Sequence, residues 1–237
     1  QNLHSYIFSG REGIGKKLFA INFAKMLLCL SESKPCNSCK SCISFEGGNH
    51  TDFMLINAED GKSIKIEQIR LMQEKVVEKP IISPKKVYII NDAELMTKEA
   101  QNCLLKTLEE PPEHVKFILA TTEPQKLPAT ILSRCQRFDF KRIKPSDIIL
   151  RMKEIAHGDK LNISEDAYEL LGRLADGSMR DSLSLLESCV AAGNGDAITV
   201  ETVSRQLGIA QDGTVAGILK AVAAHDSALR SHTLTIY

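Results

Sequence analysis

Short apolar runs alternate with helically spaced segments from the start of the chain to about Lys141. The apolar runs are SYIFSG (5–10), DFMLIN (52–57), KVYIIND (86–92) and KFILATTE (116–123). Each run is bounded by polar, glycine or proline residues. Nearly continuous apolar runs of this length are typical of strands that are covered on both faces, as in a parallel sheet. The pattern therefore predicts buried parallel strands.

Helical periods lie between these runs. One follows the first run, with apolar positions at Leu18, Ile21, Ala24, Leu27 and Leu28 in the segment 16–28. A second covers 64–77, and a third runs through 100–108 until Pro111 and Pro112 end it. Strands that alternate with helices predict a doubly wound α/β domain over residues 1–142.

The pattern changes after this domain. A proline precedes a helix start in FKRIKPSDI, and from Ile148 to Leu207 only helical periods occur, with polar and glycine-containing interruptions. We predict a small all-helical domain of about three helices over 143–208. A third helical segment begins near 209 and continues to 237, which gives the chain the look of a fragment.

Composition narrows the class of protein. Lys+Arg and Asp+Glu both number 30, so the chain lacks the basic excess that would indicate a nucleic-acid binder. We find no apolar run of membrane-spanning length and no secretory leader, and expect no membrane association. Seven cysteines without an export signal indicate a reducing compartment, the cytoplasm, where thiols serve metals or the core more often than disulfides. Cys103 and Cys189, on apolar helical faces, are predicted core residues.

The turn after the first run has the form of a phosphate-binding loop. GREGIGKK matches G-x-x-x-x-G-K-[ST] until its last position, where Lys17 replaces the hydroxyl residue. Backbone N–H groups and the helix N-terminus would face an anion, and Lys16 would reach the β- and γ-phosphates of ATP or ADP. We assign Gly10, Gly13, Gly15, Lys16 and Lys17 to this nucleotide site; a glycine-rich turn without a ligand is the alternative.

The second nucleotide motif of an active ATPase would be an acidic pair at the end of a later strand. Here that pair is Asn91 and Asp92, so the first carboxylate is missing. Lys17 and Asn91 both remove support for Mg²⁺, on which phosphoryl transfer depends. We expect impaired hydrolysis with nucleotide binding retained. A rearranged metal site formed by Asp92 and Glu94 is the alternative.

Four cysteines lie within a short span between the first helix and the second strand. Cys36, Cys39 and Cys42 are spaced C-x2-C-x2-C, and Cys29 lies seven residues upstream. Four thiolates in this span predict a closed tetrahedral Zn²⁺ site with a structural role, in the insert 29–42. Free surface thiols or a redox C-x-x-C pair are the alternatives.

The segment LLKTLEEPPEHVKFILATTEPQKLPATILSRCQRF (104–138) resembles the clamp-loader branch of the AAA+ family, notably the gamma/tau and delta prime subunits of bacterial DNA polymerase III. The tripeptide Ser133-Arg134-Cys135 and the cysteine-rich insert carry the same resemblance. It implies an AAA+ α/β domain, a helical lid and the start of a collar domain over 209–237. Because delta prime subunits commonly have degenerate nucleotide motifs, Lys17 and Asn91, with GGNHTDF and GKSIKIEQIR, favour that type.

The resemblance also implies roles for single residues. Thr122 falls at the sensor-1 position, Arg180 at sensor 2, and Arg134 at the arginine finger that reaches a neighbouring subunit's nucleotide. It further implies assembly with gamma/tau and delta subunits, and action on the sliding clamp at primer-template DNA through that complex. Ordinary surface or strand-end roles for Thr122, Arg180 and Arg134 are the alternatives.

Three functions therefore stay open at this point. The first is a non-motor clamp-loader subunit that supplies an arginine finger in trans. The second is a gamma/tau-type motor ATPase with divergent nucleotide motifs. The third is an AAA+-fold binding module outside replication. ATP hydrolysis by the purified chain would select the second, and failure to assemble with clamp-loader subunits would select the third.

Overall fold

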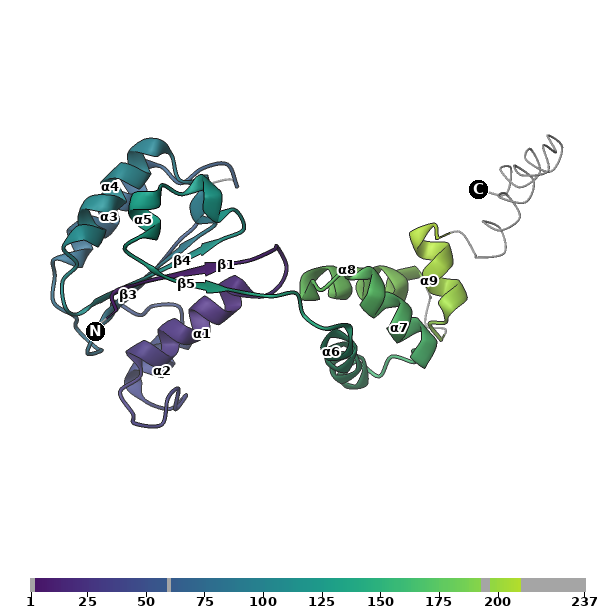
Figure 1. The fold of residues 1–237 in the computed structure, drawn as a ribbon. Coiled ribbons are helices and arrows are strands. Elements are labelled where there is room, and N and C mark those ends of the chain that lie inside the picture. The colour runs from purple at the N-terminus through teal and green to yellow at the C-terminus, as the bar shows by residue number, and fades with distance from the viewer. Residues whose placement is uncertain (1–2, 59–60, 193–196, 210–237) are drawn as a thin grey trace, which may run out of the picture. The chain divides into compact units, whose positions relative to one another are not determined.

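The computed structural model describes residues 3–58, 61–192 and 197–209. The chain divides into two compact units, with the boundary after Arg142 (Figure 1). Among the described residues, no helix combines the length and the apolar character that crossing a bilayer would require. The predicted collar segment 209–237 lies, apart from Ile209, outside the described residues.

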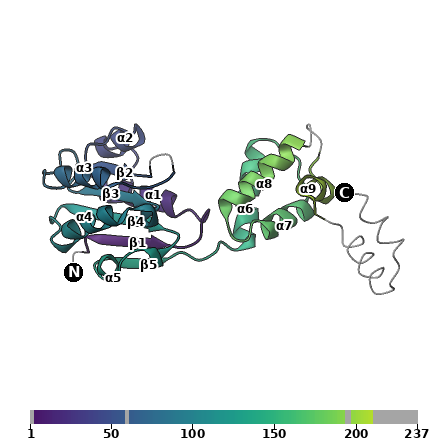
Figure 2. The ribbon, with the colours of Figure 1, turned by 90° about the horizontal axis from the view of Figure 1, so that it is seen from above.

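A five-stranded parallel sheet forms the centre of the first unit. Its strands are β1 (Ser5–Ser9), β2 (Phe53–Ile56), β3 (Lys86–Asn91), β4 (Val115–Thr121) and β5 (Gln136–Asp139). They lie in the order β2-β3-β4-β1-β5, and Figure 2 shows them side by side. The apolar runs predicted the first four. The apolar pattern missed β5, because all four of its residues are exposed.

Helices cover both faces of this sheet. On one face lie α1 (Lys16–Leu28) and the short α2 (Lys40–Glu46); on the other lie α3 (Ile66–Val76), α4 (Lys98–Glu109) and α5 (Ala129–Leu132) (Figure 1). Two 3₁₀ turns, η1 (Ala93–Leu95) and η2 (Pro124–Lys126), follow β3 and β4. Side chains of successive strand residues point to opposite faces, so Ile7 packs in the α3/α4 core and Phe8 in the α1 core.

The apolar stripe predicted for α1 is only partly its buried face. Ala20, Ala24 and Leu28 are fully buried against the sheet, whereas Leu18 is 65% exposed. The buried positions recur every four residues, and the small alanine side chains let the helix approach β3 and β4 closely. The sequence pattern identified the helix correctly but was wrong about Leu18.

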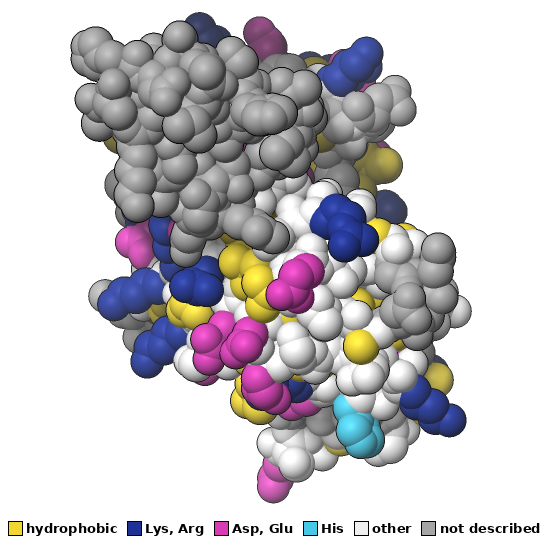
Figure 3. Space-filling model, turned by 90° about the vertical axis from the view of Figure 1, so that its right-hand side faces the viewer, with side chains coloured by type: hydrophobic (Ala, Val, Ile, Leu, Met, Phe, Trp, Pro, Cys, Tyr) yellow, Lys and Arg dark blue, Asp and Glu magenta, His cyan; other side chains and the backbone are white. Residues whose placement is uncertain are grey.

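The second unit is all-helical in its described part. It contains α6 (Pro145–Gly158), α7 (Glu165–Leu174), α8 (Met179–Ala192) and α9 (Val200–Leu207). Ile148, Met152, Leu171 and Val203 are fully buried in one shared core. A parallel doubly wound sheet followed by a small helical unit confirms the predicted fold class. On the face of the molecule in Figure 3, acidic and basic side chains both lie at the surface.

Candidate nucleotide and metal sites

The phosphate loop joins β1 to α1. Gly15 caps α1 in the left-handed conformation (φ 91°), and Gly13 also has a positive φ of 74°. At Gly10 a Cβ atom would lie 2.6 Å from the Ile14 side chain and 2.8 Å from the Phe140 carbonyl oxygen. A larger residue at Gly10 would therefore force the loop apart. The loop keeps the backbone that anion binding at a helix N-terminus requires.

Lys16 lies within this loop. The residue is 8% exposed, and its Nζ donates to the carbonyl oxygens of Gly10 (2.7 Å) and Arg11 (2.6 Å). Its ammonium group is thus directed into the loop that would surround a phosphate. Lys17, one residue later in the first turn of α1, is exposed. It supplies a positive charge but no hydroxyl oxygen as a metal ligand.

The predicted acidic pair lies at the carboxyl end of β3. Asn91 is 8% exposed, and its Nδ2 donates to Asp92 Oδ2 at 2.8 Å. Burial and the neighbouring Glu94 raise the pKa of Asp92, while Lys16 and Lys17 act in the opposite direction. The loop lysines and Asp92 therefore lie within electrostatic reach of one another. Asp92 remains the one carboxylate of the pair.

Thr122 follows the carboxyl end of β4, next to the phosphate loop. The Gly10 N–H donates to the Thr121 carbonyl oxygen at 3.3 Å, which places the loop beside this strand end. Thr122 donates its backbone N–H (3.1 Å) and its hydroxyl to Glu94 Oε1. Sequence reasoning weighed Glu94 only as a metal ligand beside Asp92. No local signal links Glu94 to Thr122, since 28 positions separate them.

The four predicted metal-ligating cysteines come together. Their sulfur atoms all lie within 4.8 Å of one another, with Sγ–Sγ distances of 3.6 Å for Cys29–Cys36 and 4.0 Å for Cys29–Cys39 and Cys36–Cys42. A tetrahedral Zn²⁺ with Zn–S bonds of about 2.3 Å requires sulfur separations of about 3.8 Å. The donor set and its geometry therefore fit zinc.

Backbone hydrogen bonds favour the thiolate form at two of these sulfurs, whereas burial raises the pKa of Cys42 to about 12. Backbone N–H groups of Ser38 and then Cys39 lower the pKa of Cys36 to about 6. The Cys39 N–H lies 3.3 Å from the Cys36 sulfur, and the Cys42 N–H lies 3.4 Å from the Cys39 sulfur. Such donors stabilise thiolates, which are the form that binds zinc. Cys39 also caps α2, and Cys42 lies in the first turn of that helix, so the start of α2 positions two of the four sulfurs.

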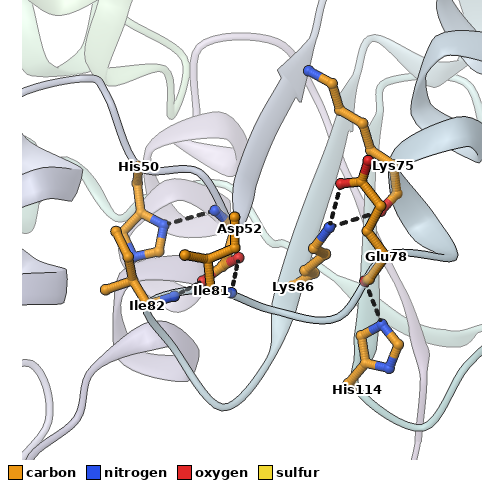
Figure 4. Close-up of polar contacts among 8 residues, drawn as sticks. All are labelled: His50, Asp52, Lys75, Glu78, Ile81, Ile82, Lys86 and His114. Carbon is orange, nitrogen blue, oxygen red and sulfur yellow. Dashed lines mark hydrogen bonds and ion pairs between the residues drawn. The ribbon is translucent and has the colours of Figure 1, made fainter.

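Buried polar side chains connect the cysteine segment to the sheet. Ser41, between two of the cysteines, hydrogen-bonds to the Leu28 carbonyl oxygen (2.8 Å), His50 Nε2 (2.9 Å) and Ser83 Oγ (3.0 Å). Asp52, 2% exposed, accepts the backbone N–H groups of Ile81, Ile82 and Ser83 at 2.7–2.8 Å. Figure 4 shows Asp52 with Ile81 and Ile82. The cysteine segment, β2 and the loop before β3 are thereby held together.

The opposite end of the same loop is held by Lys86. This residue is 2% exposed, and its Nζ donates to the Lys75 carbonyl oxygen (2.8 Å) and to Glu78 (3.2 Å) (Figure 4). His114 Nε2 lies 3.0 Å from the Glu78 carbonyl oxygen. Lys86 therefore neutralises the negative end of the α3 dipole while fixing the chain before β3.

The two predicted arginines lie in different units. Arg134 follows α5 and donates to the Thr130 carbonyl oxygen (2.8 Å) and to Glu109 (2.9 Å), with its side chain 35% exposed. It lies at the surface of the α/β unit. Arg180 is exposed in the first turn of α8 in the helical unit.

Comparisons with known proteins agree with this architecture. The family described as "DNA polymerase III, delta subunit" matches residues 1–144, and the "DNA polymerase III clamp loader subunit, ATPase lid domain" matches 147–195. DNA polymerase III subunit tau of Bacillus subtilis is 44% identical over 84% of this chain and 35% of its own length. Subunit tau/gamma of Haemophilus influenzae is 40% identical over 98% of this chain and 33% of its own.

Solved structures support the fold. A gamma subunit-related protein of Thermotoga maritima has a TM-score of 0.55 at 20% identity, over 97% of this chain and 71% of its own. The RuvB Holliday junction branch migration motor of the same organism has a TM-score of 0.60 at 14% identity, over 94% and 69%. The chain spans about a third of the length of its tau and tau/gamma relatives.

Proposed function

The chain belongs to the family of DNA polymerase III clamp-loader subunits, and we propose that it acts in a clamp loader as an AAA+ subunit that binds nucleotide without hydrolysing it. Its named relatives are tau and gamma subunits. They favour the gamma/tau type over the delta prime type that the degenerate motifs suggested. An AAA+ binding module outside replication finds no support among these relatives.

One observation carries the proposal: Lys17 and Asn91 have both lost the ligand chemistry that Mg²⁺ needs. The backbone of the phosphate loop and Lys16 remain, and these bind phosphates without the metal. Metal ions neutralise charge that develops in phosphoryl transfer, so their loss slows hydrolysis far more than binding. ATP or ADP is therefore the expected ligand, and Thr122 and Arg180 the expected sensors of its phosphates.

We further propose that Arg134 serves the nucleotide of a neighbouring subunit. Its guanidinium is permanently charged and can donate two parallel hydrogen bonds to phosphate oxygens. Glu109 holds it at the surface and would release it at a subunit contact. In this proposal the chain assembles with gamma/tau and delta subunits, and the assembled complex acts on the sliding clamp and primer-template DNA. Zn²⁺ at the cysteine cluster keeps a structural role.

ATPase measurement on the purified full-length protein tests the hydrolysis part. We expect negligible turnover with Mg²⁺, and a measurable gain when Lys17→Thr is combined with Asn91→Asp and Asp92→Glu. Adding Lys16→Ala should abolish that gain, because the loop then lacks its phosphate ligand. Turnover of the unmodified protein at a motor-subunit rate, removed by Lys16→Ala, would instead establish a motor ATPase.

Reconstitution with motor and delta subunits tests the role in trans. Arginine fingers contribute on the order of 10³ to 10⁵ in rate at the site they serve. Arg134→Ala should therefore lower the ATPase rate and clamp loading of the complex while assembly and zinc content stay unchanged. Arg134→Lys should rescue poorly, because an ammonium group lacks the paired donors. Loading at the unmodified rate would show that Arg134 is an ordinary surface residue.

A further inference from the structure

A carboxylate that the nucleotide motifs do not require lies beside the phosphate site. Glu94 is carried by η1, directly after Asn91 and Asp92, and reaches the end of β4. The phosphate loop lies beside the same strand end, because the Gly10 N–H bonds to Thr121. Glu94 is therefore positioned between the metal-related pair and the strand end next to the loop.

The bonds of Glu94 determine what Thr122 can offer a ligand. Both the backbone N–H and the hydroxyl of Thr122 donate to Glu94 Oε1. A threonine hydroxyl has one proton, so a proton donated to Glu94 is not available to a phosphate oxygen. An ionised carboxylate and a phosphate oxygen are both acceptors only. The carboxylate and a phosphate thus compete for the same donors.

Glu94 also carries charge into this site. Burial raises the pKa of Glu94, but the hydrogen bonds from Thr122 and Thr121 outweigh burial and hold the pKa below its usual range. The carboxylate is therefore ionised at neutral pH. Its second oxygen, Oε2, is buried and has no hydrogen-bond partner among the described residues. A buried anionic oxygen of this kind repels further negative charge, since little solvent screens it.

We propose that Glu94 makes this site select a nucleoside diphosphate over a nucleoside triphosphate, because its carboxylate engages the Thr122 donors and faces the region that a third phosphate would enter. The backbone N–H groups of the loop would contact the first two phosphates and Lys16 the second and third, and the third would extend toward the metal-related pair. Asn91 cannot recruit a metal cation as a carboxylate would, so no metal ion offsets the repulsion by Glu94, and Lys16 and Lys17 are the cations that act against it. The inference rests on the proposed nucleotide binding.

The competing explanation is that Glu94 has only a structural role and holds η1 against the end of β4 by its hydrogen bonds to Thr122. A neutral glutamine at position 94 could accept the same two hydrogen bonds through its own Oε1, without a buried charge. A purely structural role thus gives no reason for a carboxylate at position 94. Such a role would also affect the affinities for both nucleotides equally, whereas the charge of Glu94 repels the triphosphate more strongly than the diphosphate. The ratio of the two affinities separates the explanations.

Calorimetric titration of the full-length protein with ADP and with ATP tests the proposal. Both titrations are run with Mg²⁺ and with EDTA, where the triphosphate has its full charge. We expect ADP to bind at least roughly tenfold more tightly than ATP in EDTA, because juxtaposed like charges in a desolvated site cost several-fold in affinity or more. Glu94→Gln should reduce this ratio toward one, mainly by tightening ATP binding.

Glu99→Gln is the matched control. Glu99 is an exposed carboxylate in the first turn of α4, so its neutralisation should leave the ratio unchanged. Equal affinities for ADP and ATP in the unmodified protein would overturn the inference and leave the proposed nucleotide binding intact, and this result needs no variant. An unchanged ratio in a folded Glu94→Gln protein would also overturn it. Binding of neither nucleotide by either protein would sink the inference and the proposed binding together.

Discussion

The two ends of helix α1 show how differently two sites can be built. At its N-terminal end the phosphate loop is made mainly of backbone N–H groups, with Lys16 as the principal side chain. At its C-terminal end Cys29 begins a site made wholly of side chains. Both sites are fixed by the same helix, which packs against β3 and β4.

The comparison explains which changes each site tolerates. Lys17 in the phosphate loop and Asn91 at the end of β3 both lack the metal-ligand chemistry expected at their positions. The loop nevertheless keeps its glycine conformations and its place at the start of α1, because these do not depend on either side chain. The cysteine cluster has no backbone ligands that would remain after a side chain is lost, since each missing sulfur removes one of the four ligands of a tetrahedral ion. A site made of backbone can thus lose part of its chemistry, whereas a site made of side chains is retained or lost as a whole.

The largest expected effect is at the cysteine end. Zinc binding to structural cysteine sites is worth on the order of 10 kcal/mol and is coupled to folding. Cys39→Ser combined with Cys42→Ser should lower the zinc content, measured by elemental analysis, from one ion per chain to none. The temperature of unfolding should fall with it. Cys103→Ser, outside the cluster, should leave the zinc content unchanged; zinc-free protein before any substitution would refute the assignment.

A smaller effect on stability is expected at Asp52, which helps to hold the cysteine segment and the loop before β3 together. Asp52→Asn replaces a carboxylate that accepts three backbone N–H groups with an amide that has one acceptor oxygen. Hydrogen bonds to charged groups contribute about 1.5–3 kcal/mol each. We expect the free energy of unfolding, from urea titration, to fall by about 2–4 kcal/mol. Asp159→Asn, exposed after α6, is the control; an equal loss there would contradict this assignment.

At the phosphate-loop end, backbone and side chain can be separated directly. Gly15→Ala puts a Cβ on a residue with φ 91°, which costs about 1 kcal/mol or more and shifts the N–H groups that face an anion. We expect it to weaken ADP binding several-fold, while Lys17→Thr leaves binding in EDTA nearly unchanged. The measurement is calorimetric titration. A larger loss for Lys17→Thr would show that a side chain, and not the backbone, governs this end.

The smallest effect concerns His50. Burial lowers the pKa of His50, with Asp52 opposing this shift. The native state therefore favours neutral His50, and its contribution to stability is present above the unfolded pKa of about 6.5 and lost as pH falls through the lower folded value. His50→Gln should flatten the unfolding free energy against pH below 6.5. Zinc loss in acid affects both proteins, so the difference between their curves isolates His50; parallel curves would contradict the prediction.

Sequence alone determined the features that are encoded over short distances. The apolar runs gave four of the five strands, and the covalent spacing of the cysteines put them within reach of one ion. The phosphate loop was evident because its glycines and Lys16 are adjacent in the chain. Local periodicity and local geometry act within a few residues, so a linear pattern records them. The exposed side of α1 at Leu18 was missed because an apolar residue does not itself reveal which face is covered.

Only the tertiary structure decided the contacts between distant segments. Glu94 meets Thr122, and Asp52 meets the backbone of Ile82, because parallel pairing places the ends of β3 and β4, and of β2 and β3, side by side. The exposed strand β5 likewise exists through its pairing with β1. Strand order sets these neighbours, and strand order is fixed by packing across the whole sheet rather than by any local stretch of sequence.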